Sequence, residues 1–287
     1  MPSIEYKIVQ LANGTHSIHS VAENETFHPV VGPVAEAEAL YVRQLRLRER
    51  LAGHQGEFVI WDVGLGAAAN ALTVLRATRD LACSIRLISF DHTLEPLKFA
   101  LSHAAELGYF DGYQGRVDEL LQTSRAGFTD GSQSIFWEFH LGDFPTLLTR
   151  SLSGRSFPAP HAILFDAFSP ARNPAMWTLD LFSKLHRVLD PARPCAMPTY
   201  SRATMLRVSL LLAGFFVGAG HATGEKEETT IAASTPGLLD EPLGAAWLKR
   251  VRNSTSAEPL TGPVYRQAPL SEVHWEKLLQ HPQFMAQ

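Results

Sequence analysis

The sequence predicts an α/β protein with a Rossmann-like fold, in which a parallel sheet carries an antiparallel edge hairpin and is covered by helices. Two observations support this prediction. Between residues 57 and 235, short apolar segments typical of strands alternate with longer segments typical of helices, which is the pattern of βαβ units. The first apolar segment runs into a glycine-containing turn and then into an alanine-rich helix, an arrangement that binds nucleotide-type cofactors in such sheets.

The chain divides into three regions of different composition. Residues 1–56 form an N-terminal extension, with a polar, turn-rich start and a helix predicted over Ala35–Leu51. Residues 57–235 form the predicted Rossmann-like domain. Residues 236–287 form a C-terminal tail rich in proline and polar residues, in which a helix is predicted over Leu270–Leu279.

The predicted strands are apolar runs bounded by polar or turn residues. They lie at Phe58–Val63, Ile85–Asp91, Ser134–His140, Ala162–Asp166 and Cys195–Tyr200. The predicted helices follow them and carry apolar residues at helical spacing. They lie at Ala68–Arg79, Leu94–Ala105, Phe144–Leu152, Pro174–Val188 and Ala203–Ala213. Ligands of such sheets bind at the carboxyl ends of the strands, so the residues at those ends are the candidates for function.

The composition is that of an ordinary globular protein. Hydrophobic residues make up 45% and charged residues 19% of the 287 residues, and the net charge is −4, which excludes extended disorder and a strongly basic surface. The apolar stretch Val208–Val217 reaches only about half of a membrane span, and the first residues lack a signal-peptide pattern. We therefore expect a cytoplasmic protein without a membrane segment, in which Cys83 and Cys195 are reduced core thiols.

No metal site is predicted from the sequence. His16, His19 and His28 share a turn-rich segment without a nearby cysteine, and two distant cysteines do not form a metal-binding knuckle.

The first strand leads into the predicted cofactor site. It ends around Asp62 and is followed by Gly64 and Gly66, where the absence of side chains lets the backbone approach a ligand closely. The next strand ends in Asp91, whose carboxylate can accept both hydroxyl hydrogens of a ribose. Asn70, in the first turn of the alanine-rich helix, is assigned to the same site.

The residues favour S-adenosylmethionine over a dinucleotide as the cofactor. The turn lacks the last glycine of the dinucleotide fingerprint. S-adenosylmethionine carries no phosphate and brings a cationic sulfonium and an amino-acid end, which suit carboxylates such as Asp62. Asp143 follows the third strand and can accept a hydrogen bond from an adenine amino group. Each signal also has a structural alternative: a Gly-x-Gly pair is common, Asp91 could be an exposed strand-end residue, and Asp143 could cap the next helix.

The fourth strand ends in the candidate catalytic residue, Asp166, which an aromatic and proline-containing loop follows. An aliphatic amine is largely protonated near neutral pH, so a carboxylate that orients it and accepts its proton can act as the base. Phe168 and Trp177 are the candidates for holding a planar substrate ring. The alternatives are that Asp166 caps the loop and that both aromatic residues belong to the core.

These motifs resemble the methyltransferase family that acts on the wobble uridine of bacterial tRNA, which occurs as a module of MnmC and as the stand-alone MnmD. The resemblance covers most of residues 10–235, and Asp166–Trp177 is its most distinctive segment. The other segments that carry it are Asn13–Ser17, Glu25–His28, the helix around Glu38, Gly64–Asn70, Leu141–Asp143, Thr199–Ala203 and Leu212–Phe215.

The resemblance implies transfer of a methyl group to the exocyclic amine of 5-aminomethyl-2-thiouridine, with tRNA as the partner. It also implies that Asp166 lies next to the reacting amine and that Gly64, Gly66, Asp91 and Asp143 line the cofactor. The chain contains no flavin fingerprint, so a stand-alone module without an oxidase domain is expected.

The chain departs from the family pattern in two places. The family's Gly-x-Gly-Thr-Gly turn has Ala67 and Ala68 as its last two residues here, and the usual basic run is replaced by the acidic segment Gly224–Glu228. Fewer cationic side chains weaken contacts with RNA phosphates, although Arg43–Arg50 and Lys249–Arg252 are other candidate basic surfaces. Two alternatives therefore remain: a methyltransferase of this fold that acts on a small amine or another non-tRNA acceptor, and a non-catalytic relative that binds S-adenosylmethionine.

Overall fold

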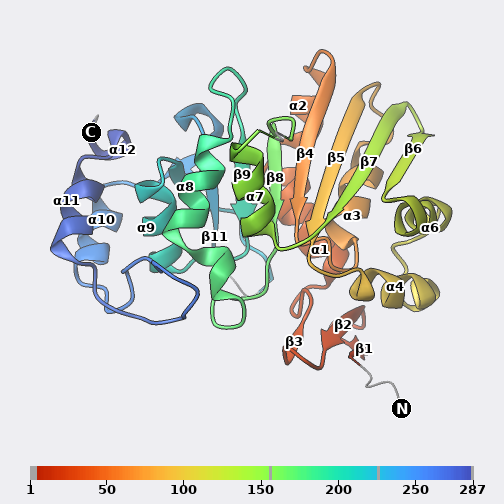
Figure 1. Ribbon diagram of the computed structural model, residues 1–287, viewed down its shortest axis with the longest axis horizontal. Helices are drawn as coiled ribbons and strands as arrows, with labels where there is room; N and C mark the ends of the chain where they lie inside the picture. Colours follow the sequence, from red (N-terminus) through yellow and green to blue (C-terminus); the bar gives the residue numbers. More distant parts are fainter. Residues whose placement is uncertain (1–4, 155–156, 225–226, 286–287) are drawn as a thin grey trace. The chain divides into compact units, whose positions relative to one another are not determined.

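A computed structural model of the chain describes residues 5–154, 157–224 and 227–285 (Figure 1). The chain forms two compact units. The first unit consists of Met1–Asp143, Ala162–Asp166 and Ala222–Glu227. The second unit consists of the remaining segments, Phe144–His161, Ala167–His221 and Glu228–Gln287. The division into three regions that the composition suggests stays a proposal.

The strands of the first unit form a mostly parallel sheet in the order β8-β4-β5-β7-β6. β4 (Glu57–Val63) lies between β5 (Ser84–Asp91) and β8 (Ala162–Phe165) and is parallel to both. β7 (Gln133–Leu141) is parallel to β5, and β6 (Arg125–Asp130) is antiparallel to β7. β4 is buried except at its first residue, as expected for a parallel strand covered on both faces. The predicted Rossmann-like sheet is confirmed.

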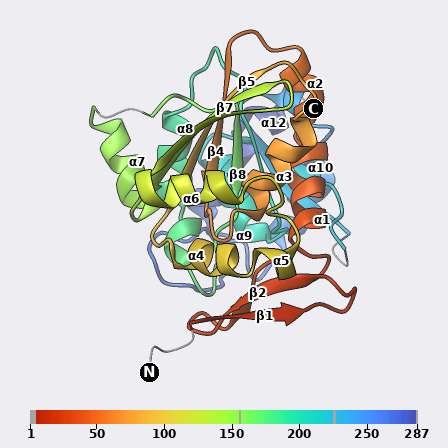
Figure 2. The same cartoon turned by 90° about the vertical axis from the view of Figure 1, so that its right-hand side faces the viewer.

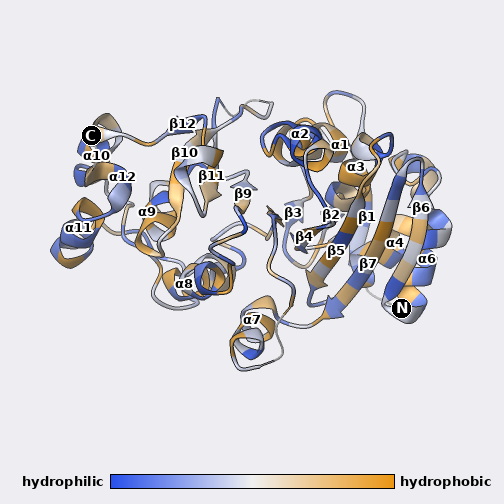
Figure 3. Cartoon of the chain, turned by 90° about the horizontal axis from the view of Figure 1, so that it is seen from above, coloured by the Kyte–Doolittle hydropathy of each residue, from blue (hydrophilic) through white to orange (hydrophobic). Residues whose placement is uncertain are grey.

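The helices of the first unit differ from the predictions mainly in where they break. α3 (Ala69–Thr78) agrees with its predicted range. The helix predicted over Leu94–Ala105 is divided into α4 (Glu95–Ser102) and α5 (Ala104–Leu107). The division occurs because His103 leaves the helical conformation, with φ −116° and ψ 26°. α6 (Gln114–Thr123) packs on β6 and β7 and was not predicted. Its only buried residues are Val117 and Leu120, and Figure 3 shows that it is largely hydrophilic. So few apolar residues give a weak helical pattern.

The N-terminal segment forms a three-stranded antiparallel ribbon followed by a broken helix. The ribbon consists of β1 (Tyr6–Gln10), β2 (His16–Ser20) and β3 (Glu25–Thr26), and Figure 2 shows it beside α5, which contacts β2. The helix predicted over Ala35–Leu51 begins earlier, at Pro33, a residue favoured in a first helical turn. It comprises α1 (Pro33–Ala37), the π-helix η1 (Glu38–Arg43) and α2 (Leu47–Ala52). The break between η1 and α2 contains Arg46, which has a left-handed conformation.

The second unit contains antiparallel strands in the order β12-β10-β11-β9. The strands are β9 (Ala196–Thr199), β10 (Phe216–Gly220), β11 (Thr229–Ala233) and β12 (Glu241–Pro242), and β10 with β11 forms an antiparallel hairpin. The helices are α7 (Phe144–Leu152), η2 (Pro174–Trp177), α8 (Leu179–Arg187), α9 (Thr204–Leu212), η3 (Pro236–Leu238), α10 (Ala245–Arg252), α11 (Glu272–Leu279) and α12 (Pro282–Met285).

One predicted helix of the second unit is divided by a cap. The range Pro174–Val188 holds the 3₁₀ turn η2 and the helix α8, because Thr178 between them is extended, with ψ 150°. The Thr178 hydroxyl accepts a hydrogen bond from the backbone N–H of Leu181 at 3.2 Å, which is the usual capping interaction at a helix start. Within the described residues, no helix is long and apolar enough to cross a membrane.

The C-terminal region is more structured than the sequence suggested. α10 and α12 were not predicted, because α10 buries only Trp247 and Val251, one residue per turn. Gln283 in α12 is buried. Its side-chain amide makes hydrogen bonds with backbone groups, as a neighbouring strand would do. It accepts a hydrogen bond from the Val217 N–H at 2.8 Å and donates to the carbonyls of Val217 and Leu243 at 2.7 and 2.8 Å.

We expect Gln283→Leu to lower the free energy of unfolding by about 2 to 4 kcal/mol, because the Val217 N–H and the Leu243 carbonyl lose their partner while buried. Urea denaturation of the two proteins measures this difference. Gln280→Leu, at an exposed position of the same region, is the control and should change stability by less than about 0.5 kcal/mol. Equal effects of the two substitutions would contradict the assignment.

Candidate functional site

The turn after β4 is held in place by the end of β5. The backbone N–H groups of Gly64 and Leu65 donate to the carbonyl of Phe90 at 3.0 and 3.2 Å. Gly66 donates its N–H to Oδ2 of Asp91 at 2.9 Å. Gly64 and Gly66 have φ values of 92° and 50°, in the region that favours glycine. The turn therefore has the backbone conformation that the Gly-x-Gly pattern predicts.

Ala68, one of the two departures from the family turn, also has a left-handed conformation, with φ 60°. It immediately precedes α3, and its N–H donates to the carbonyl of Leu65 at 2.7 Å. A left-handed alanine costs about 1 to 2 kcal/mol relative to ordinary helical geometry. This cost explains why glycine is the usual residue at the end of this turn.

Asp91 orders the turn and the start of the following loop. One oxygen accepts the Gly66 N–H, and the other accepts the Thr93 N–H at 3.3 Å and lies 3.1 Å from Nδ1 of His92. The hydrogen bond from His92 to Asp91 raises the pKa of His92, and the charges of Asp91, Glu23 and Asp143 act in the same direction. Asp143 is exposed, at the end of the loop after β7. The predicted acids Asp91 and Asp143 therefore influence one histidine.

Asp62 is a fully buried carboxyl group at the end of a polar chain that crosses three strands. The Trp137 indole N–H donates to the Ser89 hydroxyl at 2.9 Å, and that hydroxyl donates to Oδ2 of Asp62 at 2.8 Å. Burial raises the pKa of Asp62 to about 7, the Ser89 hydrogen bond opposes this shift, and the charges of Asp166 and Asp91 add to it. The structure thus brings Asp91 and Asp166 within electrostatic range of Asp62.

Several buried polar atoms near this turn accept or donate no hydrogen bond within the described part of the chain. They are Oδ1 of Asp62, Oδ1 of Asn70 and Oγ1 of Thr73. Buried polar atoms in proteins are nearly always hydrogen-bonded, so an unpaired group calls for a bound ligand or water. A polar, cationic ligand such as S-adenosylmethionine fits this set of acceptors.

Asp166 follows β8 directly and is anchored by its own backbone, whose N–H donates to the Val63 carbonyl at 3.0 Å. The Asn70 side-chain amide donates to Oδ2 of Asp166 at 2.7 Å. Tyr41 donates its hydroxyl to the carbonyl of Phe165, the residue before, at 3.2 Å. Asn70, assigned from the sequence to the cofactor, therefore also orients the candidate base.

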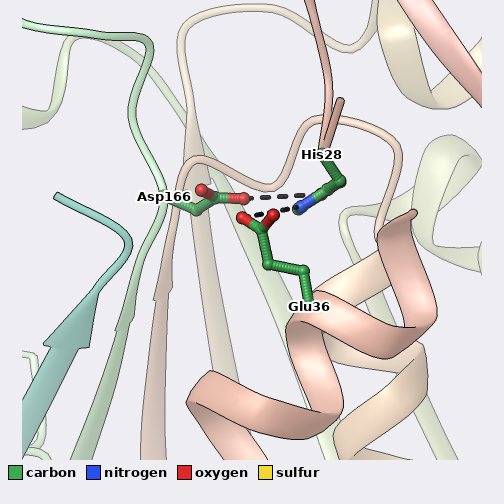
Figure 4. Close-up of side chains that lie close together, drawn as sticks. All are labelled: His28, Glu36 and Asp166. Atoms are coloured by element: carbon green, nitrogen blue, oxygen red, sulfur yellow. Dashed lines mark ion pairs between the residues drawn. The ribbon is translucent and has the colours of Figure 1, made fainter. Parts of the chain in front are cut away.

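His28 and Glu36 are the residues of this site that the sequence analysis did not identify. Nε2 of His28 lies 3.5 Å from Oδ2 of Asp166, and Nδ1 lies 3.6 Å from Oε1 of Glu36 (Figure 4). The side chains of His28, Glu36 and Asp166 are only 9%, 7% and 16% exposed. The available signal was the Glu25–His28 segment of the family resemblance, whereas Glu36 lies in an ordinary helical pattern.

The same three side chains place one nitrogen and two oxygens within 4.8 Å of one another, which is close enough to bind a cation. The contacts in the structure are those of a histidine ring between two carboxylates. Glu36 faces one ring nitrogen and Asp166 faces the other. The Asn70 amide donates to the Asp166 oxygen that lies nearest to Nε2 of His28.

The two predicted ring-binding residues lie in the second unit. Trp177 has no exposed surface, its indole N–H donates to the carbonyl of Phe168 at 2.8 Å, and its ring lies edge-on to Tyr200 with centroids 6.0 Å apart. A fully buried ring offers no face to a substrate. The assignment of Trp177 to substrate binding is therefore corrected to the core alternative, in which it holds the loop after β8. Phe168 is partly exposed.

Comparisons with known proteins identify relatives of the chain. A family described as S-adenosyl-L-methionine-dependent methyltransferase matches residues 132–235. The tRNA 5-methylaminomethyl-2-thiouridine biosynthesis bifunctional protein MnmC of Methylibium petroleiphilum is 28% identical over 242 residues, covering 78% of this chain and 34% of that protein. The MnmC protein of the same name from Aeromonas hydrophila is 30% identical over 216 residues, covering 68% of this chain and 30% of that protein. The chain thus spans about a third of the length of these relatives.

Two solved structures share the fold. MNMC2 from Aquifex aeolicus has a TM-score of 0.66 at 22% identity, covering 96% of this chain and 84% of that one. A spermidine synthase in complex with the transition-state analogue AdoDATO has a TM-score of 0.51 at 11% identity, covering 95% and 79% of the two chains.

The sheet, the glycine turn and the family match define the class of protein, an S-adenosylmethionine-dependent methyltransferase, as the sequence predicted. Within this class, the chain is similar to the MnmC proteins over about a third of their length.

We expect Asp62→Asn to gain stability over the wild type as the pH rises from about 4 to 7. In this range the folded protein binds more protons at Asp62 than the unfolded chain does, since burial raises the pKa of Asp62 to about 7, so the wild type loses stability with increasing pH. The difference should reach about 2 to 4 kcal/mol in urea denaturation at pH 4 and pH 7.5.

Ser89→Ala is the matched comparison. It removes the hydrogen bond that lowers the pKa of Asp62, so its stability should fall more steeply than that of the wild type over the same range. Parallel stability curves for the three proteins would show that Asp62 does not titrate in this way.

Proposed function

We propose that the chain transfers the methyl group of S-adenosylmethionine to the exocyclic amine of 5-aminomethyl-2-thiouridine at the wobble position of tRNA. The observation that carries this proposal is a carboxylate, Asp166, fixed by the amide of Asn70 at the edge of the sheet that also holds Asp62 and Asp91. The similarity to MnmC supplies the acceptor. The cytoplasm, where tRNA is modified, is the proposed location.

The cofactor is assigned to the turn after β4 and the acids around it. Gly64 and Gly66 allow close approach of the backbone, and Asp91 faces the ribose hydroxyls while it holds the turn. Asp62 and Asp143 complete the site, Asp62 toward the cationic part and Asp143 toward the adenine. When bound, S-adenosylmethionine supplies a methyl group on a positively charged sulfur.

Asp166 performs the acid–base chemistry of the acceptor. The incoming aliphatic amine is protonated near neutral pH, and an ammonium group pairs with a carboxylate. Asp166 orients this group and accepts its proton, which exposes the nitrogen lone pair for in-line attack on the methyl carbon. Asn70 restricts the carboxylate to one orientation through the bond to Oδ2. This chemistry requires neither a metal ion nor a flavin.

A methyltransferase of the same fold with a small amine as its acceptor is the second candidate. The acidic segment Gly224–Glu228 and the net charge of −4 favour it, because RNA binding relies on cationic side chains. Residues 225 and 226 of this segment lie outside the described residues. A non-catalytic S-adenosylmethionine-binding relative is a weaker candidate, since it would have no use for Asp166.

We expect methyl transfer from labelled S-adenosylmethionine to tRNA that bears the aminomethyl group, and none to the same tRNA lacking it. Equal labelling of both tRNAs would reject the tRNA proposal. Labelling of a free amine such as spermidine, without labelling of tRNA, would support the second candidate.

We expect substitutions of two acids of the site to separate binding from chemistry. Asp166→Asn should lower kcat by about 10²- to 10⁴-fold, with little change in cofactor affinity measured by calorimetry. Asp91→Asn should instead weaken cofactor binding, because it disturbs the acceptor of the Gly66 N–H. An Asp166→Asn enzyme with wild-type turnover would refute the base assignment.

A further inference from the structure

The geometry points to His28 and Glu36 as positioning residues that draw the proton of the acceptor amine away from Asp166. This inference rests on the proposed function, and it adds a proton path to the carboxylate. It starts from one arrangement: a histidine ring held between two carboxylates, one of which is the candidate base (Figure 4).

Three separate elements of the first unit contribute to this arrangement. His28 follows β3, Glu36 lies in α1, and Asp166 follows β8. The three side chains are all mostly buried, so their charges are poorly screened by solvent. Glu36 from α1 and Asp166, which follows β8, both face the His28 ring.

The direction of proton transfer follows from the order of the groups. Neutral imidazole accepts a proton at one nitrogen, and a carboxylate at the other nitrogen stabilises the resulting cation. Here Nε2 faces Asp166 and Nδ1 faces Glu36. Glu36 therefore stabilises the protonated ring when His28 receives a proton from Asp166. Asn70 keeps the Asp166 oxygen nearest to His28 in place.

The proton and electron balance of the reaction is complete with these groups. The substrate ammonium gives one proton to Asp166, and Asp166 passes it to Nε2 of His28. The freed lone pair forms the N–C bond to the methyl carbon while the C–S bond breaks and its electron pair stays on sulfur. The product is a secondary ammonium, and S-adenosylhomocysteine leaves uncharged at sulfur. His28 releases the proton to water after the product departs.

The backbone around His28 is constrained, as a positioning role requires. His28 has a left-handed conformation with φ 48°, which is uncommon for a residue other than glycine. The preceding residue, Phe27, is held on β2, since its N–H donates to the Ile18 carbonyl at 2.8 Å and its carbonyl accepts the Ser17 hydroxyl. The Phe27 ring lies close to Gly66, because a Cβ atom placed on Gly66 would be 3.3 Å from a ring carbon of Phe27. Phe27 thus lies against the turn after β4, and the next residue, His28, lies against the candidate base Asp166.

The first test is the pH profile of His28→Gln on the aminomethyl-bearing tRNA. We expect kcat to fall by about 100-fold at pH 7 with cofactor affinity unchanged. The defect should shrink to about 10-fold or less by pH 9, because more of the amine is already deprotonated as the pH approaches its pKa of about 10. Glu36→Gln should show a smaller defect with the same pH trend.

His19→Gln is the matched control. His19 lies on the same ribbon, where Nδ1 is 2.9 Å from the Thr26 hydroxyl, and its replacement should leave the pH profile unchanged. A His28→Gln defect that is equal at every pH, or a defect of the same size in His19→Gln, would mean that His28 has a structural role only. Dependence of the wild-type activity on an added divalent metal would overturn the proton path in favour of a cation site.

The second test does not depend on turnover. Histidine-selective NMR follows the His28 ring during a pH titration, and the midpoint should fall by about one pH unit or more in Glu36→Gln and in Asp166→Asn, because each loses a carboxylate that stabilises the protonated ring. An unchanged midpoint in both variants refutes the inference. Absence of methyl transfer by the wild type refutes the proposed function instead, so the two failures are distinguishable.

Discussion

The parallel pairing of β4 with β5 and β8 determines where three carboxylates of the candidate site lie. Because the three strands run in the same direction, Asp62, Asp91 and Asp166 meet at one edge of the sheet. Backbone hydrogen bonds then fix the turns that leave this edge, from Gly64 to Phe90 and from Asp166 to Val63.

Placing several carboxylates at one buried edge is unfavourable unless donors or cations compensate them. The chain meets this requirement differently at each acid. Ser89 donates to Asp62, the Gly66 backbone donates to Asp91, and Asn70 donates to Asp166. The remaining negative charge suits the positively charged sulfonium of S-adenosylmethionine, which is consistent with the methyltransferase class.

The sequence predicted the sheet well, because long apolar runs that end in acids or glycines are strong local signals. It did not predict α6 or α10, since each buries only two residues. In the site, it identified the acids at strand ends but not His28 and Glu36. Their role depends on a ribbon and a helix that meet a distant strand, which no local spacing encodes. Trp177 was misassigned because an aromatic residue beside a candidate base has the same pattern whether it is buried or exposed.

The buried position of Asp62 also links cofactor binding to protons. Because burial raises the pKa of Asp62 to about 7, a large part of the carboxyl groups is protonated in the free protein near neutral pH. In the proposed binding mode a positively charged sulfur lies close to this group and favours its ionised form, so we expect uptake of the methyl donor to release a fraction of a proton into the solvent. The heat of association would then vary with the ionisation enthalpy of the buffer, and the donor would bind more tightly in alkaline than in acidic solution.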